Sequence, residues 1–152
     1  MSWRALTEAD LLTAISPNEL DVLRRALGGD ASDAISAILT NLANELRGYI
    51  AAGGSDLDST AATVPDSLVA QAAAVAVIRV SNRAGGTLPD PKGLRAKAHD
   101  NAITFFQNSL GKGLFAIEQP TSTTLATLSG VPAKPTYTAK DLKLQRDDQN
   151  GL

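Results

Sequence analysis

The sequence predicts an all-α fold: a small bundle of about five helices followed by an extended C-terminal arm. The main observation is the stretch 68–80, in which eleven of thirteen residues are apolar and only Gln71 and Arg79 interrupt them. A helix without a polar face must be covered on nearly every side, and this one is too short to span a bilayer. Aromatic residues make up only 4% of the chain while alanine is abundant, which favours close packing of helices over a β-sandwich. We therefore expect a central helix wrapped by other helices of the chain or by neighbouring copies.

The composition bounds the possible functions. A chain of 152 residues is long enough for one domain that buries roughly 70% of its unfolded surface. The net charge of −2 argues against a globally basic nucleic-acid-binding protein. The absence of cysteine excludes disulfides, thiolate catalysis and cysteine-based metal sites. The first twelve residues lack the long apolar core of a secretory signal, so we expect a soluble protein that is made and kept in the cytoplasm.

Two short helices are expected at the N-terminal end, because the start signal of a helix occurs twice there. Thr7 is an N-cap residue with Asp10 three positions later, a variant of the capping box. Ser16 repeats the arrangement with Glu19, and Pro17 stands at the first helical position. Both helices should therefore begin at well-defined residues.

A longer third helix should begin after Asp30 and end at Gly53. Apolar residues at the three-four spacing of one helix face run through it: Ile35, Ile38, Leu39, Leu42, Leu46, Tyr49 and Ile50. The polar stretch 53–63 that follows is expected to be a loop.

The central helix should start at 64–66 and end at Gly85-Gly86. A fifth helix is expected to begin at Asp90-Pro91 and to run over about 94–110, and the third and fifth helices should flank the central one. The predicted buried stripe of the fifth helix consists of Leu94, Ala98, Ala102, Phe105, Phe106 and Leu110.

The character of the chain changes after the fifth helix. Residues 114–117 favour a short strand, and the rest is rich in Thr, Ser, Pro and Lys. A stretch with so few large apolar groups cannot bury itself alone, so it is either disordered or ordered by a partner. We expect a helical domain over 1–118 and an arm over 119–152. Its candidate contacts with a partner are Tyr137, Leu142 and Leu144.

No residue pattern predicts a catalytic, cofactor or metal site. His99 is the only histidine and has no evident partner set, so it is expected at the surface or its boundary. Asp56 and Asp58 lack the further oxygen ligands of a calcium loop and are expected to be solvated. The stretch 111–113, Gly-Lys-Gly, lacks the remaining residues of a phosphate-binding loop and is expected to end a helix.

Two further features have alternative interpretations. The helix pair at 7–27 is short, like a helix-turn-helix, and its second helix carries Arg24 and Arg25; a small DNA-binding protein is therefore the alternative function. Against it, carboxylates near the start of that helix would oppose DNA phosphates. Trp3, the only tryptophan, is either an interface anchor or a cover for the bottom of the core.

The expected elements follow in a distinctive order: a short helical pair, a helix ending in Glu45-Leu46-Arg47-Gly48-Tyr49-Ile50, a loop closing with Val64-Pro65 and Leu68, an alanine-rich helix ending near Arg79, and a last helix followed by Gly111-Lys112-Gly113. This order resembles the head–tail connector (adaptor, or head-completion) proteins of tailed bacteriophages, as in lambdoid and Mu-like phages. The resemblance covers about 3–118. The loop at 53–63 and the polar arm after Glu118 depart from the family pattern.

The resemblance implies a helical structural protein of the virion neck without enzymatic activity or cofactor. Such proteins form a ring, typically a dodecamer, beneath the portal protein. The ring extends the DNA channel and provides the docking surface for the tail or a stopper protein. DNA would pass through it without sequence-specific binding, no membrane would be involved, and assembly would take place in the host cytoplasm. Within the same setting, the alternative is a small DNA-binding phage packaging protein.

Overall fold

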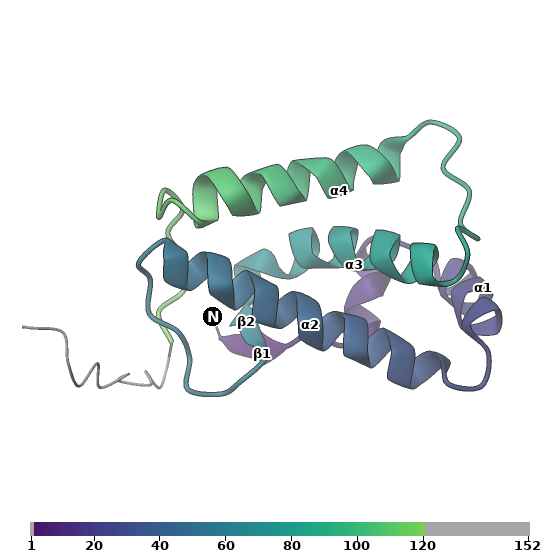
Figure 1. Ribbon diagram of the computed structural model, residues 1–152, viewed down its shortest axis with the longest axis horizontal. Helices are drawn as coiled ribbons and strands as arrows, with labels where there is room; N and C mark the ends of the chain where they lie inside the picture. Colours follow the sequence, from purple (N-terminus) through teal and green to yellow (C-terminus); the bar gives the residue numbers. More distant parts are fainter. Residues whose placement is uncertain (1, 121–152) are drawn as a thin grey trace, which may run out of the picture.

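The computed structural model describes residues 2–120 of the chain, which are mostly helical (Figure 1). In chain order the elements are β1 (Trp3–Ala5), the 3₁₀ helix η1 (Glu8–Thr13), α1 (Pro17–Leu27), α2 (Ala31–Ala52), β2 (Thr63–Pro65), the 3₁₀ turn η2 (Asp66–Leu68), α3 (Val69–Arg83), α4 (Leu94–Phe105) and the π-helical turn η3 (Phe106–Leu110). The predicted helical bundle is confirmed, but the all-α prediction missed the small β1–β2 sheet. The predicted extended arm lies almost wholly outside the described residues.

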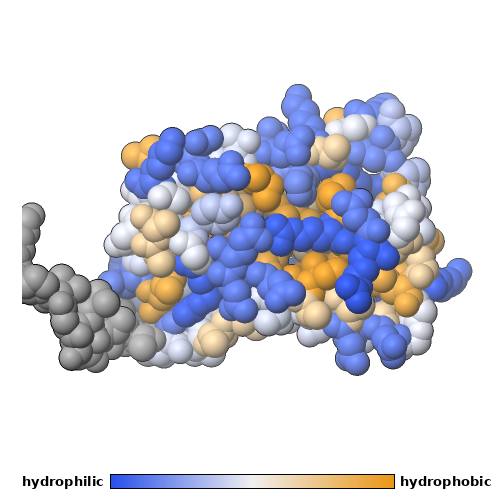
Figure 2. Space-filling view, viewed as in Figure 1, coloured by the Kyte–Doolittle hydropathy of each residue, from blue (hydrophilic) through white to orange (hydrophobic). Residues whose placement is uncertain are grey.

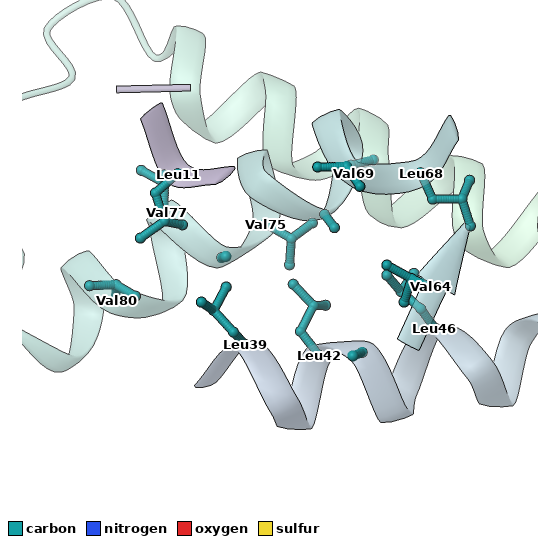
Figure 3. Packing of buried hydrophobic residues seen from close by; sticks show 14 of the residues in the cluster. Leu11, Leu39, Leu42, Leu46, Val64, Leu68, Val69, Val75, Val77 and Val80 are labelled. Atoms are coloured by element: carbon teal, nitrogen blue, oxygen red, sulfur yellow. The ribbon is translucent and has the colours of Figure 1, made fainter. Parts of the chain in front are cut away.

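The helix α3 lies between α2 and α4, as predicted (Figure 1). Its buried residues occupy most of its circumference: Val69, Ala72, Ala73, Val75, Ala76, Val77, Val80 and Ser81. Figure 3 shows Val75 above Leu39 and Leu42 of α2, and Val77 beside Leu11 of η1. The apolar stretch at 68–80 is therefore the centre of the core, because three separate elements pack against it.

The helix α2 supplies the second wall of the core through the apolar face that the sequence predicts. Ile35, Leu39, Leu42, Leu46 and Ile50 are buried, and each such side chain stabilises the fold by about 1.5–3 kcal/mol. The other two predicted members, Ile38 and Tyr49, are only partly buried and pack at the edge of the core. The three-four spacing of apolar residues thus identifies the buried face of α2 correctly. Ile38 and Tyr49 lie at the edges of that face.

Both predicted N-terminal capping boxes are present. Asp10 Oδ2 accepts a hydrogen bond from the backbone N–H of Thr7 at 2.7 Å. Glu19 Oε2 accepts one from the backbone N–H of Ser16 at 2.9 Å, and Ser16 Oγ accepts from Glu19 N–H at 3.4 Å. The element after Thr7 is a 3₁₀ helix, whereas the element after Ser16 is the α-helix α1. The side chain of Asp30, the cap expected for α2, makes no capping hydrogen bond.

The prediction that 64–66 starts the central helix is wrong, because Thr63–Pro65 forms the strand β2. It pairs antiparallel with β1, with Trp3 opposite Pro65, Arg4 opposite Val64 and Ala5 opposite Thr63. Val64 is fully buried, so the pairing places its β-branched side chain in the core. Residues far apart in the sequence create this ladder, which local helix signals do not reveal.

The predicted strand at 114–117 is also absent: this stretch contains no strand, and its side chains are used for packing. The ring of Phe115 meets the ring of Phe105 edge to face, with centroids 4.9 Å apart. Ile117 also packs against the core, while Leu114 is 77% exposed. Aromatic packing therefore takes the place of backbone pairing here.

The fifth predicted helix is realised as α4 and η3, but its buried stripe begins later than expected. Ala102, Phe106 and Leu110 are buried. Leu94 is 64% exposed and Ala98 is exposed as well, so the first half of the predicted stripe is wrong. The cause is the small size of the α3 residues facing it, which leaves a groove described below. The predicted start at Asp90-Pro91 precedes the helix, although Asp90 Oδ2 accepts the backbone N–H groups of Arg95 and Ala96, each at 3.0 Å.

Two turns meet backbone to backbone where α2 and η3 end. A Cβ atom at Gly53 would clash with the carbonyl oxygen of Leu110 and lie 2.9 Å from the backbone nitrogen of Gly113. Gly113 has a φ of +67°, in the left-handed region that favours glycine. The Gly-Lys-Gly stretch at 111–113 is thus a helix stop, as predicted, and it also fixes the end of η3 against α2.

We predict that Gly53→Ala destabilises the protein by about 1–3 kcal/mol, the usual cost of forcing extra atoms into a packed region. The matched control is Gly48→Ala in α2, where a Cβ atom meets nothing within 4 Å. That change should stabilise the helix by about 0.5–1 kcal/mol. Chemical denaturation measures the free energy of unfolding of both variants. Equal values for Gly53→Ala and Gly48→Ala would contradict the close approach of the backbone at Gly53 to Leu110 and Gly113.

Candidate functional site

The polar residues that were candidates for chemistry from the sequence, His99, Asp56 and Asp58, do not form a reaction centre. Within residues 2–120, no three His, Asp or Glu side chains lie close enough to hold a metal ion. His99 lies at the surface boundary, with Nδ1 3.0 Å from Asp100 Oδ1. Asp56 is exposed as predicted, but Asp58 is only 5% exposed, which contradicts a solvated loop. Its Oδ1 accepts a hydrogen bond from Thr60 N–H at 2.8 Å, so Asp58 shapes the loop from within.

Arg47 holds this loop against α2, a role that the local sequence pattern does not reveal. Its guanidinium donates to the carbonyl oxygen of Asp58 at 2.8 Å and to that of Thr60 at 3.0 Å. The same group also lies 5.8 Å from the centroid of the Trp3 ring. Five N–H donors in a rigid fork allow one side chain to satisfy several loop carbonyls, which explains why an arginine stands here.

Trp3 lies partly buried against the core in strand β1. Its Nε1 donates a hydrogen bond to the carbonyl oxygen of Glu118 at 2.9 Å. These contacts support the interpretation that Trp3 covers the core. Its role as an interface anchor stays a prediction. The other candidate interface residues, Tyr137, Leu142 and Leu144, lie outside the described residues.

A polar network fastens the N-terminal strand to the bundle. Arg4 donates two hydrogen bonds to the carboxylate of Asp10, the longer at 2.9 Å, and one from Nε to Asp66 at 2.9 Å. The hydrogen bonds from Arg4 hold the pKa of the Asp10 carboxyl down at about 2. The arrangement is a structural clamp between β1, η1 and η2.

The basic residues of α1 are only partly free to bind nucleic acid. Arg24 Nε donates to Glu8 at 2.8 Å, and its Nη1 donates to Asp21 at 3.1 Å. Arg25 is exposed. Because Arg24 is shared between two carboxylates, this surface offers DNA phosphates little unpaired positive charge.

The feature best suited to binding is an open apolar groove between α3 and α4. Two adjoining hollows of about 340 Å³ and 380 Å³ share the residues Ala70, Ala74 and Ala98. Thr13 and Leu94 line one end of the groove, and Phe105 lines the other. Alanine has no side chain beyond Cβ, so the alanines that line both hollows leave the space between the two helices unfilled. We refer to this feature as the α3–α4 groove.

One residue that lines the groove carries a buried, unpaired polar atom. Gln71 Oε1 is buried and has no hydrogen-bond partner, and Gln71 lines the hollow that ends at Phe105. Arg95, at the opposite end, is held by a hydrogen bond to the carbonyl oxygen of Pro89 at 2.6 Å and by an ion pair with Glu19. The hollow that ends at Phe105 is otherwise lined by alanines and by the exposed Asn101, so most of its wall is apolar.

Both polar interruptions of the apolar stretch now have an explanation. Gln71 lines the groove, and Arg79 forms an ion pair with Glu45 of α2 at 2.7 Å. Figure 2 shows apolar surface between α4 and α2 that hydrophilic side chains cross. The sequence showed these two positions as polar, but the spacing alone did not indicate what they contact.

Comparisons of the chain with protein-family models, with curated proteins and with solved structures found no match. Within residues 2–120, no helix is both long enough and apolar enough to cross a membrane.

We predict that Asp10→Asn lowers the free energy of unfolding by about 2 kcal/mol at pH 7, because the salt bridge with Arg4 is weakened. The folded-state pKa of about 2 lies below the ordinary value of 3.8, so Asp10 stabilises the fold above pH 3.8 and this contribution is lost as the pH falls towards 2. The difference between variant and parent should shrink over that range. Urea denaturation at several pH values tests this, with exposed Asp56→Asn as the control. A difference that is constant with pH would contradict it.

Proposed function

We propose that this protein is a structural head–tail connector of a tailed bacteriophage. In this role its subunits form a ring beneath the portal protein, extend the DNA channel and give the tail or a stopper protein a surface to dock on. The proposal places the protein in the virion neck, after assembly in the host cytoplasm.

The observation that carries the proposal is the order of the elements over 3–118, the stretch that resembles the connector family. A short helical pair, η1 and α1, precedes α2; a loop and β2 lead to the apolar helix α3; and α4 with η3 ends at 111–113. The hydrogen bond between Trp3 and Glu118 joins the two ends of this stretch. It supports the view that the resemblance covers one structural unit.

Exposed apolar side chains at one end of the bundle support assembly with other copies. Leu94 is 64% exposed, Leu12 is 44% exposed and Val22 is 42% exposed. Leu94 lines the same hollow as Thr13, the neighbour of Leu12, and Arg95 is ion-paired with Glu19 of α1. The start of α4, the end of η1 and α1 therefore lie together, and their apolar side chains are suited to a contact between subunits.

The alternative, a small DNA-binding packaging protein, receives less support from the geometry. The first element of the supposed helix-turn-helix is a 3₁₀ helix of six residues, and Arg24 is engaged by Glu8 and Asp21. A recognition helix needs free donors near its N-terminus, and α1 carries Glu19 there.

We predict that the purified protein, alone or with its portal protein, forms rings visible by negative-stain electron microscopy. Leu94→Asp should abolish them, because a charge in an apolar contact loses its water without gaining a partner. Leu114→Asp, at a residue 77% exposed, is the control and should leave the rings intact. A protein that stays monomeric with its portal present, and binds DNA in a salt-dependent way that Arg24→Ala with Arg25→Ala removes, would favour the alternative instead.

We also predict that removal of 121–152 leaves the helical unit folded but weakens assembly. The described contacts that stabilise the bundle lie within 2–120, whereas Tyr137, Leu142 and Leu144 are proposed to contact a neighbour, the portal or a tail component. Circular dichroism measures the fold, and mass measurement in solution gives the assembly state. Loss of helicity on truncation would contradict a separate arm.

A further inference from the structure

The α3–α4 groove has the properties of a binding site for an uncharged chain segment. It is open, it is formed by Ala70, Ala74 and Ala98, and its only buried unpaired polar atom is Gln71 Oε1 among the described residues. The alanines that form the groove suit small apolar groups of an occupant.

Near its end, the described chain contacts the turn that precedes α3. Glu118 accepts hydrogen bonds from Ser67, one from Oγ at 2.6 Å and one from the backbone N–H at 3.1 Å. Ser67 stands three residues before Ala70 in the turn that leads into α3. Phe115 packs on Phe105, which lines the same end of the groove. Two independent contacts therefore bring the polypeptide close to one end of the groove.

The sequence that follows has the matching chemistry. No charged residue occurs from 119 to 133, whereas 134–148 contain seven. Residues 121–129 read Thr-Ser-Thr-Thr-Leu-Ala-Thr-Leu-Ser, which combines two leucines with six hydroxyl groups. Leucines suit the alanine-lined hollows, and hydroxyl groups can hydrogen-bond to the side-chain amide of Asn101, which lines one of them.

We propose that 121–129 of the same chain dock in the α3–α4 groove, with Leu125 or Leu128 in its hollows. The length of the chain is sufficient. A helix rises about 1.5 Å per residue, so Ser67 in η2 and Ala74 in α3 are on the order of 10 Å apart. An extended chain covers that distance in about three or four residues, which is fewer than the segment contains. The charged remainder of the arm, with Tyr137, Leu142 and Leu144, stays available for a partner.

This inference concerns contacts within one subunit and does not depend on the connector proposal. Subunits that form rings and subunits that do not are equally able to hold their own segment in the groove. The experiment must therefore detect contact between the segment and the groove within one chain.

Disulfide trapping in the full-length protein tests the proposal without background, because the chain has no cysteine. Ala98→Cys lies in the groove on α4, and Ala98 is exposed, so the change should not disturb the core. It is combined in turn with a single cysteine at each position from 123 to 129. The matched control series carries Asp100→Cys in place of Ala98→Cys, on the same helix at a side chain that is 78% exposed. Circular dichroism verifies the fold of each variant before oxidation.

The proposal predicts an intramolecular disulfide with Cys at 98 at one or two segment positions, formed at least tenfold faster than in the control series and independent of protein concentration. Equal rates in both series, or no disulfide in the Ala98→Cys series, would overturn it. Disulfides that link two chains and speed up with concentration would also overturn it, because the occupant would then be the segment of a neighbouring copy. The same series with Ala74→Cys, on the α3 side of the groove, should also form an intramolecular disulfide with the segment.

Discussion

The burial of α3 is the constraint on which the rest of the structure depends. A helix that is apolar around most of its circumference is stable in water only when other elements cover it. Leu39 and Leu42 of α2 cover one side, and Leu11 of η1 packs beside Val77 (Figure 3). The alanines of α3 allow these elements to approach closely, but where alanine also faces α4 the same small side chains leave the groove. Stability and an open surface thus have one origin, the small size of the α3 residues.

Much of the fold could be predicted from the sequence, because helix positions are encoded locally. Ser16, Pro17 and Glu19 mark the start of α1 through a capping box, and the three-four spacing gives the buried face of α2. The β1–β2 ladder could not be predicted, because it joins Arg4 to Val64, and three-residue strands are too short for an alternating pattern. The stretch 114–117 has a composition typical of a strand, but no local signal indicates that Phe115 packs against Phe105 instead.

The candidate surface was harder to predict than the fold. The spacing correctly places Leu94 and Ala98 on the same face as Ala102, but it does not say how closely the opposite helix approaches. Gln71 stands out in the sequence as an interruption, and only the structure indicates that its carbonyl oxygen is buried without a partner. The contacts of Glu118 with Trp3 and Ser67 join residues more than fifty positions apart, so they too leave no local signal.

The central role of α3 is tested most directly by native-state hydrogen exchange of its amides. If α3 is the element that all others cover, the amides from its second turn to Val80 exchange only when the whole protein unfolds. Their opening free energy then equals the free energy of unfolding from denaturant titration, while the amides at the start of α4 open at a lower free energy. Opening of α3 at a free energy well below that of global unfolding, or as readily as the start of α4, would contradict the account.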